Sequence, residues 1–407
     1  MARLRRRITS RREAMLALVI ICVFAFTGVC FCDTFTNQQT NEVFHGYATG
    51  RTEGGQTSIY TQEKGAMKLN LSEWQITRDK SGRNNKVIVL PIDDIIMYEM
   101  ETTAFEQAIA ADANEGPLLI LVEIDTPGGR IDLAHRICAA ITKIKNCDVI
   151  AFIKGGQYGG AISAGAAVAL ACDRIYVANN TVIGAATLVS GEKNKAQLKD
   201  KNYEDVIDEK QSSAWRAYLA SLAQQNNRPG LVARAMVDRT IEVIEVNQAG
   251  KRMFIEPVNK KPEQQVVRTW NKSGSLLTLT AQEAVECSIA DGLADTQQEL
   301  LQKLQAGDAN VVVDKKTANA RKELQLAQRK VDEILKSFDL KLKQTQYSQP
   351  TPKFLSILRG ARSDFETLKD LAKKYPDLNL NIASIEAELN SINAAYENAQ
   401  RESRSRK

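Results

Sequence analysis

Ser163 is the residue whose surroundings suggest chemistry. A glycine-rich stretch, residues 155–160, precedes it, and a run of small apolar residues, 164–170, follows it. This pattern predicts a turn between a short strand at residues 148–153 and a buried helix. The first N–H groups of a helix have no partner within the helix and favour negative charge, so a serine at this turn has donors for an oxyanion nearby. The alternative is a tight turn that leads into a close-packed helix and performs no chemistry.

A nucleophilic serine needs a base, and histidines are scarce in this chain. The two histidines are His45, in a polar stretch, and His135, which is expected on the surface of a helix. A lysine is the better candidate if it loses solvent, because the reference pKa of lysine is about 10.4. The candidate lysines after the serine are Lys193, Lys195, Lys199, Lys201 and Lys210. The first four lie in a polar, charged segment, whereas Lys210 leads into an amphipathic helix at residues 214–223. The alternative for Lys210 is a solvated surface charge.

A second glycine-rich turn follows a near-continuous apolar strand predicted at residues 118–124. It consists of Asp125, Thr126, Pro127, Gly128 and Gly129. From Lys86 onwards, strands, turns and helices alternate, which predicts an α/β fold built of βαβ units. Because the carboxyl ends of parallel strands meet at one edge of a sheet, the two glycine-rich turns are expected to face one crevice.

Several separated motifs occur in an order that resembles a known family. They are residues 125–129, Ser-Ala-Gly at 163–165, Ile-Gly-Ala at 183–185, the helix around residues 218–224, and a helix leading into a last strand at 279–294. Together they resemble the NfeD-type membrane-bound serine proteases of the ClpP class, in the ClpP/crotonase superfamily. The resemblance covers about residues 86–303 and implies a ClpP/crotonase-like spiral of βαβ units.

The resemblance also implies a site and a reaction. It implies a catalytic dyad of Ser163 and Lys210, with the backbone N–H groups of Gly129 and Ala164 as the oxyanion hole. The implied substrate-binding positions are Gly128 and Gly160, where a substrate must come close to the backbone. The implied activity is serine endopeptidase activity that needs no metal, nucleotide or other cofactor. Its substrates would be hydrophobic, membrane-proximal proteins, including a membrane protein of stomatin type, and the enzyme would be a homo-oligomer.

The chain is expected to have four parts. Residues 1–32 begin with arginines at positions 3, 5, 6, 7, 11 and 12 and continue with an apolar stretch, as in a signal peptide or an N-terminal membrane anchor. Residues 33–85 are predicted to be a polar spacer with one hairpin, at 46–60. Residues 86–305 are the predicted serine protease domain, and residues 306–407 are predicted to be a helical bundle or coiled coil. The arginines should stay in the cytoplasm, so we expect the catalytic domain on the extracytoplasmic (periplasmic) side.

The composition argues against two other classes of site. The net charge of +5 is mild, and no basic stripe interleaved with aromatic residues supports nucleic-acid binding. Among the seven cysteines, those beyond the N-terminal apolar stretch are Cys138, Cys147, Cys172 and Cys287. They show no CxxC spacing, so we expect no metal site. Their spacing leaves open whether one disulfide forms.

Two regions depart from the family pattern. Residues 243–277 form a longer, polar insertion with an expected hairpin, which could be a lid, an oligomer contact or surface decoration. From about residue 314 the sequence is helical, with breaks at Pro350, Pro352 and Pro376. Its last helix has an apolar seam at Ile382, Ile385, Leu389, Ile392 and Tyr396. This tail could pack within the chain, or it could serve oligomerisation or partner docking.

Three functions therefore stay open. The first is a membrane-anchored or secreted Ser-Lys peptidase. The second is a crotonase-type enzyme that uses the same oxyanion hole on an acyl thioester, although export and the Ser-Ala-Gly turn argue against it. The third is a catalytically silent scaffold that acts through its helical tail.

Overall fold

The computed structural model of the 407-residue chain describes residues 33–53, 56–61, 63–70, 73–77, 84–188, 201–304, 306–345 and 352–405. The expected signal peptide or membrane anchor, residues 1–32, lies outside these ranges. Within them, no helix has both the length and the apolar character that a membrane span needs.

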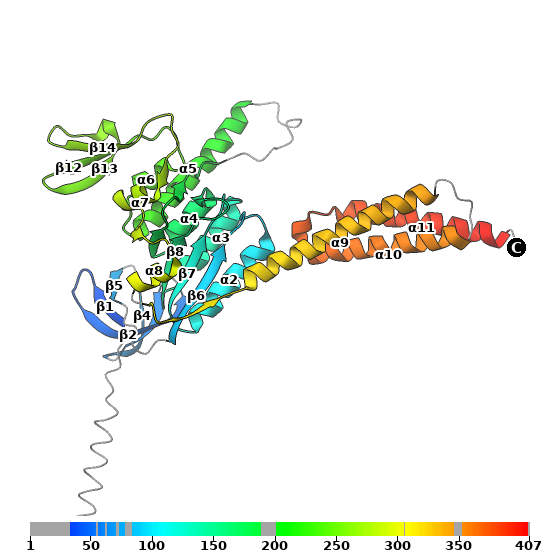
Figure 1. The fold of residues 1–407 in the computed structure, drawn as a ribbon, viewed down its shortest axis with the longest axis horizontal. Helices are drawn as coiled ribbons and strands as arrows, with labels where there is room; N and C mark the ends of the chain where they lie inside the picture. The colour runs from blue at the N-terminus through cyan, green and yellow to red at the C-terminus, as the bar shows by residue number, and fades with distance from the viewer. Residues whose placement is uncertain are drawn as a thin grey trace, which may run out of the picture.

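A six-stranded parallel sheet forms the centre of the molecule (Figure 1). In order across the sheet, its strands are β16 (Gly292–Leu293), β10 (Arg174–Val177), β8 (Asp148–Ile153), β7 (Pro117–Ile124), β6 (Asn84–Ile92) and β17 (Asn310–Val313). The α/β class expected from the sequence is therefore confirmed.

Both faces of this sheet are covered, which explains why its strands are almost continuously apolar. One face packs against α2 (Glu99–Asn114), α3 (Ile131–Thr142) and α4 (Ala164–Ala171), and its side chains include Ile88, Leu90, Ile120 and Val122. The other face packs against α8 (Gln297–Lys303), and its side chains include Val87, Val89, Leu119 and Leu121. Alternate residues of each strand therefore serve different cores.

A small three-stranded sheet holds the serine turn. It consists of β9 (Gly160–Ile162), β11 (Val182–Gly184) and β15 (Thr278–Thr280). The helices α5 (Lys201–Gln225) and α6 (Gly230–Ala235) follow β11 in the chain. After β15, Thr280 and Glu283 form a capping box at the start of α7 (Ala281–Glu286). The chain then enters β16, so the predicted helix leading into a last strand is present.

Residues 33–77 form a sheet of their own, in which the sequence predicted only one hairpin. Five antiparallel strands lie in the order β4 (Gly65–Leu69), β3 (Gln56–Thr61), β2 (Val43–Glu53), β1 (Asp33–Asn37) and β5 (Trp74–Thr77). The pairing of β2 with β3 contains the predicted hairpin. The other strands were missed because the buried core is small, with Phe35, Phe44, Ile59, Leu69 and Trp74 scattered among Thr, Gln and Asn.

The polar insertion forms a fourth sheet rather than one hairpin. The strands β12 (Val243–Gln248), β13 (Lys251–Ile255) and β14 (Gln265–Asn271) pair antiparallel with β12 in the centre, and the short 3-10 helix η2 (Pro257–Asn259) lies between β13 and β14. This sheet projects from the central domain (Figure 1).

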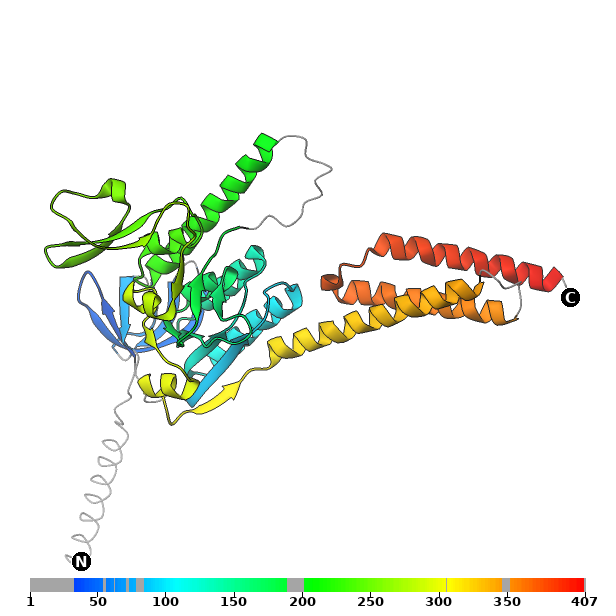
Figure 2. The same ribbon diagram turned by 45° about the horizontal axis from the view of Figure 1, so that its top comes forward.

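The C-terminal region consists of helices, as expected, and extends away from the sheets (Figure 2). Its elements are α9 (Lys316–Thr345), α10 (Pro352–Lys374), η3 (Pro376–Leu378) and α11 (Ile382–Ser405). Helix α10 begins at Pro352 and ends just before Pro376, where the sequence predicted breaks. The helices share an apolar core that includes Val331, Ile334, Phe365, Leu368, Ile385 and Ile392. A coiled coil in the strict sense stays a prediction, as do the boundaries of the four parts.

Candidate functional site

Ser163 occupies a strained position between β9 and α4. Its φ of 56° and ψ of −118° are unusual for a residue with a side chain. Such a conformation costs on the order of 1–3 kcal/mol and persists only where the surroundings enforce it. Here the Ser163 amide donates to the Gly184 carbonyl at 2.8 Å. Because strained residues cluster at functional sites, this conformation marks Ser163 as a candidate functional residue.

The two glycine-rich turns lie against one another, whereas the crevice that the sequence predicted between them stays a prediction. The Thr126 amide donates to the Gly160 carbonyl at 2.9 Å, and the Ile162 amide donates to the Thr126 carbonyl at 3.1 Å. A Cβ atom on Gly128 would lie 2.5 Å from the Cβ atom of Ser163 and 2.9 Å from its Oγ. Gly128 therefore has to be a glycine for Ser163 to occupy its place.

Gly129 is packed as tightly as Gly128, but against Ile96 instead of Ser163. Its φ is 152°, and an added Cβ atom would overlap the backbone of Ile96. The Ile96 amide donates to the Gly128 carbonyl, and the Arg130 amide donates to the Ile96 carbonyl, each at 2.8 Å. Residue 96 therefore fixes the glycine turn from the side opposite Ser163.

Two backbone amides at this place are candidate oxyanion donors. Over the ranges that the structure describes, the N–H groups of Gly129 and Ala164 donate to no protein acceptor. The amides next to them are used, since Gly128 donates to Thr126 Oγ1 at 3.1 Å and Ser163 donates to Gly184. Ala164 begins α4, so its N–H group lies at the positive end of the helix dipole. Two available donors beside a serine can stabilise negative charge.

Gly160 serves packing within the small sheet. Its amide donates to Asp125 Oδ1 at 3.1 Å, and its carbonyl accepts from Thr126. An added Cβ atom would overlap the backbone of Val182 in β11. Its predicted contact with a substrate stays a prediction.

Asp125 positions the serine turn, a role that sequence reasoning missed. The buried carboxylate accepts from the amides of Tyr158 and Gly160, both at 3.1 Å. The sequence did contain a hint of this role. Asp125 is the first residue of the glycine-rich turn, and its short carboxylate side chain can accept hydrogen bonds at the end of an apolar strand. Its partners are more than 30 residues away in the chain, so no local pattern identified them.

Lys210 does not reach the serine in this structure. It lies on the N-terminal half of α5, which projects from the domain (Figures 1 and 2). Its side chain is exposed, and within the described parts of the chain no hydrogen bond or ion pair joins it to Ser163. Helix α5 is anchored further along, where Trp215 is buried and its Nε1–H donates to the Ala186 carbonyl at 2.9 Å.

His135 is not the free helix-surface residue that the sequence predicted. Its ring is half-buried beneath α5, with its centroid 3.9 Å from that of Tyr218 and 5.2 Å from that of Trp215. Burial lowers the pKa of His135, and the nearby carboxylate of Asp132 opposes this only in part. The other histidine, His45, is paired with Glu63 in the N-terminal sheet.

The other candidate lysines and the cysteines contribute no observed contact to the described part of the site. The side chain of Lys201 lies outside the described residues, as do Lys193, Lys195 and Lys199. Four cysteines of the described residues are buried and form no disulfide: Cys138, Cys147, Cys172 and Cys287. Burial raises the pKa of Cys138 and of Cys287 to about 12, so both stay protonated near neutral pH.

Comparison with known proteins confirms the resemblance to NfeD-type membrane proteins for the central part of the chain. Residues 86–266 match the family model described as NfeD1b, N-terminal domain. Membrane protein NfeD1b of Bacillus subtilis is 30% identical over 219 residues, which are 54% of this chain and 41% of that protein. Membrane-bound protease PH1510 of Pyrococcus horikoshii is 27% identical over 139 residues, which are 34% of this chain and 30% of that protein. The chain thus spans less than half the length of these relatives.

Two similar solved structures are mutants of the same protease. A serine-to-alanine mutant of the 1510-N membrane-bound stomatin-specific protease is 22% identical, with a TM-score of 0.41 over 57% of this chain and 98% of that chain. A lysine-to-alanine mutant of it in complex with a substrate peptide is also 22% identical, with a TM-score of 0.40 over 57% of this chain and 92% of that chain.

Proposed function

We propose that this chain is a serine endopeptidase with a ClpP/crotonase-like catalytic domain, in which Ser163 is the nucleophile and Lys210 the base. The observation that carries the proposal is the strained Ser163 beside the two available amides of Gly129 and Ala164. A curated relative named a membrane-bound protease adds support.

The proposed reaction uses only groups of this chain and one water. Ser163 Oγ attacks the peptide carbonyl carbon, and neutral Lys210 takes the hydroxyl proton. The amides of Gly129 and Ala164 hold the oxyanion, each worth about 3 kcal/mol of barrier reduction. The intermediate then collapses, Lys210 gives its proton to the leaving amine, and water hydrolyses the acyl-enzyme.

The exposed position of Lys210 sets a condition on this mechanism. A solvated lysine stays protonated near neutral pH and cannot accept the serine proton. Lys210 must therefore approach Ser163 and lose solvent before the first step. We propose that assembly into a homo-oligomer or binding of the substrate brings Lys210 to Ser163 and removes its solvent.

The proposed substrates are hydrophobic, membrane-proximal proteins, including one of stomatin type, as the family resemblance implies. Residues 1–32 would direct the catalytic domain out of the cytoplasm, as a signal peptide or as an anchor. The names of both curated relatives describe membrane proteins, which supports a membrane location.

A second candidate is a catalytically silent scaffold that acts through its helical tail. The exposed Lys210, without a contact to Ser163, favours it. A crotonase-type acyl-thioester enzyme would use the same oxyanion hole. Its usual cofactor is cytosolic, however, and the proposed export of this domain argues against that function.

Labelling with a fluorophosphonate probe tests the proposal. We expect the wild-type protein to be labelled, Ser163→Ala to abolish labelling, and Lys210→Ala to slow it by on the order of a hundredfold or more. Ser221→Ala on α5 and Lys336→Ala on α9 are matched controls at exposed positions. A folded wild-type protein that resists the probe would favour the scaffold. Unchanged labelling of Lys210→Ala would exclude Lys210 as the base and direct the search to Lys201 or His135.

A further inference from the structure

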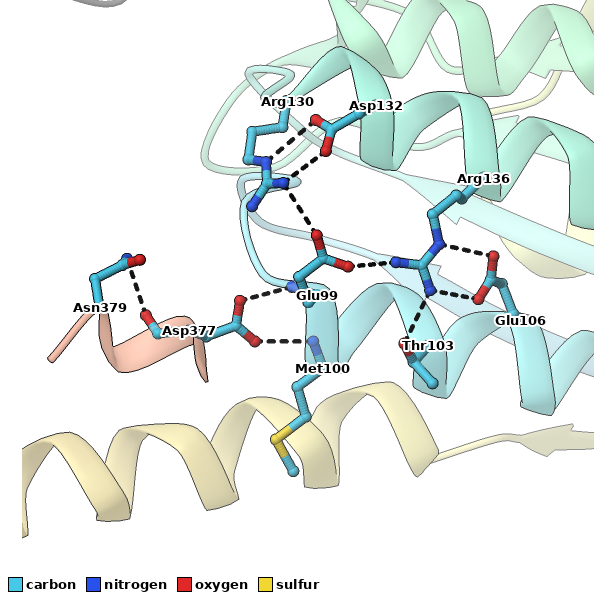
Figure 3. A network of polar contacts seen from close by, with 9 residues as sticks. All are labelled: Glu99, Met100, Thr103, Glu106, Arg130, Asp132, Arg136, Asp377 and Asn379. Carbon is cyan, nitrogen blue, oxygen red and sulfur yellow. Dashed lines mark hydrogen bonds and ion pairs between the residues drawn. The ribbon is translucent and has the colours of Figure 1, made fainter. Parts of the chain in front are cut away.

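The C-terminal helices provide the missing cap of α2. The N-cap residue of α2, Tyr98, makes no side-chain capping hydrogen bond. Instead, Asp377 of η3 accepts from the Glu99 amide at 2.8 Å and from the Met100 amide at 2.9 Å (Figure 3). A carboxylate at a helix N-terminus satisfies unpaired donors and complements the helix dipole.

From the start of α2, contacts continue to the glycine turn. The Glu99 carboxylate accepts from Arg130 Nη2 at 3.0 Å and also pairs with Arg136 (Figure 3). Arg130 follows Gly129 directly and is bonded through its backbone to Ile96. The segment of residues 96–99 therefore contacts the candidate oxyanion donor on one side and the C-terminal helices on the other.

Arg321 of α9 makes a second connection. Its guanidinium binds both oxygens of Glu101, at 3.0 and 2.9 Å, and Asp93 Oδ1 at 2.9 Å. Burial of Glu101 raises the pKa of its carboxyl, and the pairing with Arg321 opposes that rise. The side chain of Arg321 is 20% exposed and that of Glu101 is 10% exposed, so the ion pair between them is largely shielded from solvent.

Asp94 extends this second connection to both glycine-rich turns. Its Oδ2 lies 3.6 Å from Arg321 Nη1, and its Oδ1 accepts from the Tyr158 hydroxyl at 2.8 Å. Tyr158 belongs to the turn before Ser163. The Asp94 carbonyl also accepts from Thr126 Oγ1 at 2.7 Å, and Thr126 Oγ1 accepts from the Gly128 amide.

The junction has an apolar part as well. Leu324, Ala327 and Tyr375 form a buried cluster, against which Tyr98 and Met100 pack. The segment of residues 93–98 between β6 and α2 contains only an isolated bridge, at Ile96. It therefore depends on tertiary contacts for its conformation, and many of these come from the C-terminal helices.

We infer that Asp377 and Arg321 are positioning residues of the candidate site. They hold residues 93–99, and through them the amide of Gly129 and the turn before Ser163, in the observed arrangement. The catalytic meaning of this inference rests on the proposed peptidase function, whereas the mechanical link does not.

Hydrogen–deuterium exchange of the full chain tests the link without any assay of activity. We expect Asp377→Ala to lower the protection of the Ile96 and Arg130 amides roughly fivefold, the scale of a lost helix cap. Asp377→Asn keeps one of the two acceptor oxygens and should restore part of the protection. Asp364→Ala is the matched control, because it breaks an ion pair with Lys341 inside the C-terminal helices and away from the junction.

Two further measurements keep the inference open to refutation. Arg321→Lys keeps the charge but cannot bind both oxygens of Glu101 in the same way, so it should loosen Ile96 less than Arg321→Ala does. Wild-type protection at Ile96 and Arg130 in Asp377→Ala, with exposure only of Glu99 and Met100, would overturn the inference. So would a uniform loss of protection that includes β7 and β8.

Probe labelling separates the inference from the proposed function. If both hold, Asp377→Ala slows fluorophosphonate labelling of Ser163 roughly in proportion to the lost protection, and Asp364→Ala does not. Loss of protection in a protein that is never labelled would support the link and reject the peptidase. Full labelling with unchanged protection would support the peptidase and reject the link.

Discussion

The two halves of the candidate site differ in how completely they are built. Around Ser163, backbone atoms of two turns and a helix start interlock, so that Gly128 and Gly129 have no space for a Cβ atom. Around Lys210, the side chain is exposed on a projecting half-helix. The proposed oxyanion half is made of backbone, so local sequence can preorganise it, whereas the proposed base half depends on how a distant helix docks.

The largest effect is expected from Gly129→Ala. The added methyl group would overlap the Ile96 backbone, so we expect a loss of about 3 kcal/mol or more in the free energy of unfolding. Gly159→Ala is the matched control, because Gly159 has a φ of 75° and nothing within 4 Å of an added Cβ atom. It should cost only about 1 kcal/mol. Urea denaturation measures both, and equal losses would contradict the tight packing of the serine half.

Asp125→Ala should have the next largest effect. It leaves the amides of Tyr158 and Gly160 without their acceptor, which should cost about 2 kcal/mol of stability. Asp125→Asn retains one oxygen acceptor and should lose less. Thermal melting compares the two variants, and a loss as large in Asn as in Ala would show that the charge, rather than the acceptor, matters.

His135, which packs beneath α5, should have a smaller and pH-dependent effect on the free energy of unfolding. Because burial lowers its pKa below the ordinary value of 6.5, the unfolded chain takes up a proton at a higher pH than the folded chain does. Stability should therefore be greatest above pH 6.5 and fall as the pH drops through 6.5. Denaturation monitored by tryptophan fluorescence at pH 7.5 and pH 5.5 should show this, and His135→Gln should reduce the dependence. An identical pH dependence in that variant would rule out His135 as its source.

The smallest stability effect is expected at Lys210. Its exposed side chain has no partner among the described residues, so Lys210→Ala should change the free energy of unfolding by less than about 0.5 kcal/mol. Lys336→Ala provides the comparison on another exposed helix face. A large loss of stability in Lys210→Ala alone would reveal a buried lysine and weaken the contrast between the two halves.

The contrast also shows what the sequence can predict. The parallel sheet and the meeting of the two glycine-rich turns followed from local patterns, because strand periodicity and adjacent glycines are local signals. The surroundings of Lys210 and His135 depend on the docking of α5, which no local pattern specifies. The Asp377 cap was missed for the same reason, since it joins residues 278 positions apart.

The edge strand β17 has a mechanical consequence. It pairs in parallel with β6 over Asn310 to Val313, and the chain runs on directly into α9 (Figure 2). Tension applied along α9 would stress these evenly spaced hydrogen bonds in shear, all at once, instead of opening them one after another. A pull on the distal helices would thus load two attachments, the contacts of the C-terminal helices with the start of α2 and the β17–β6 pairing at the edge of the sheet.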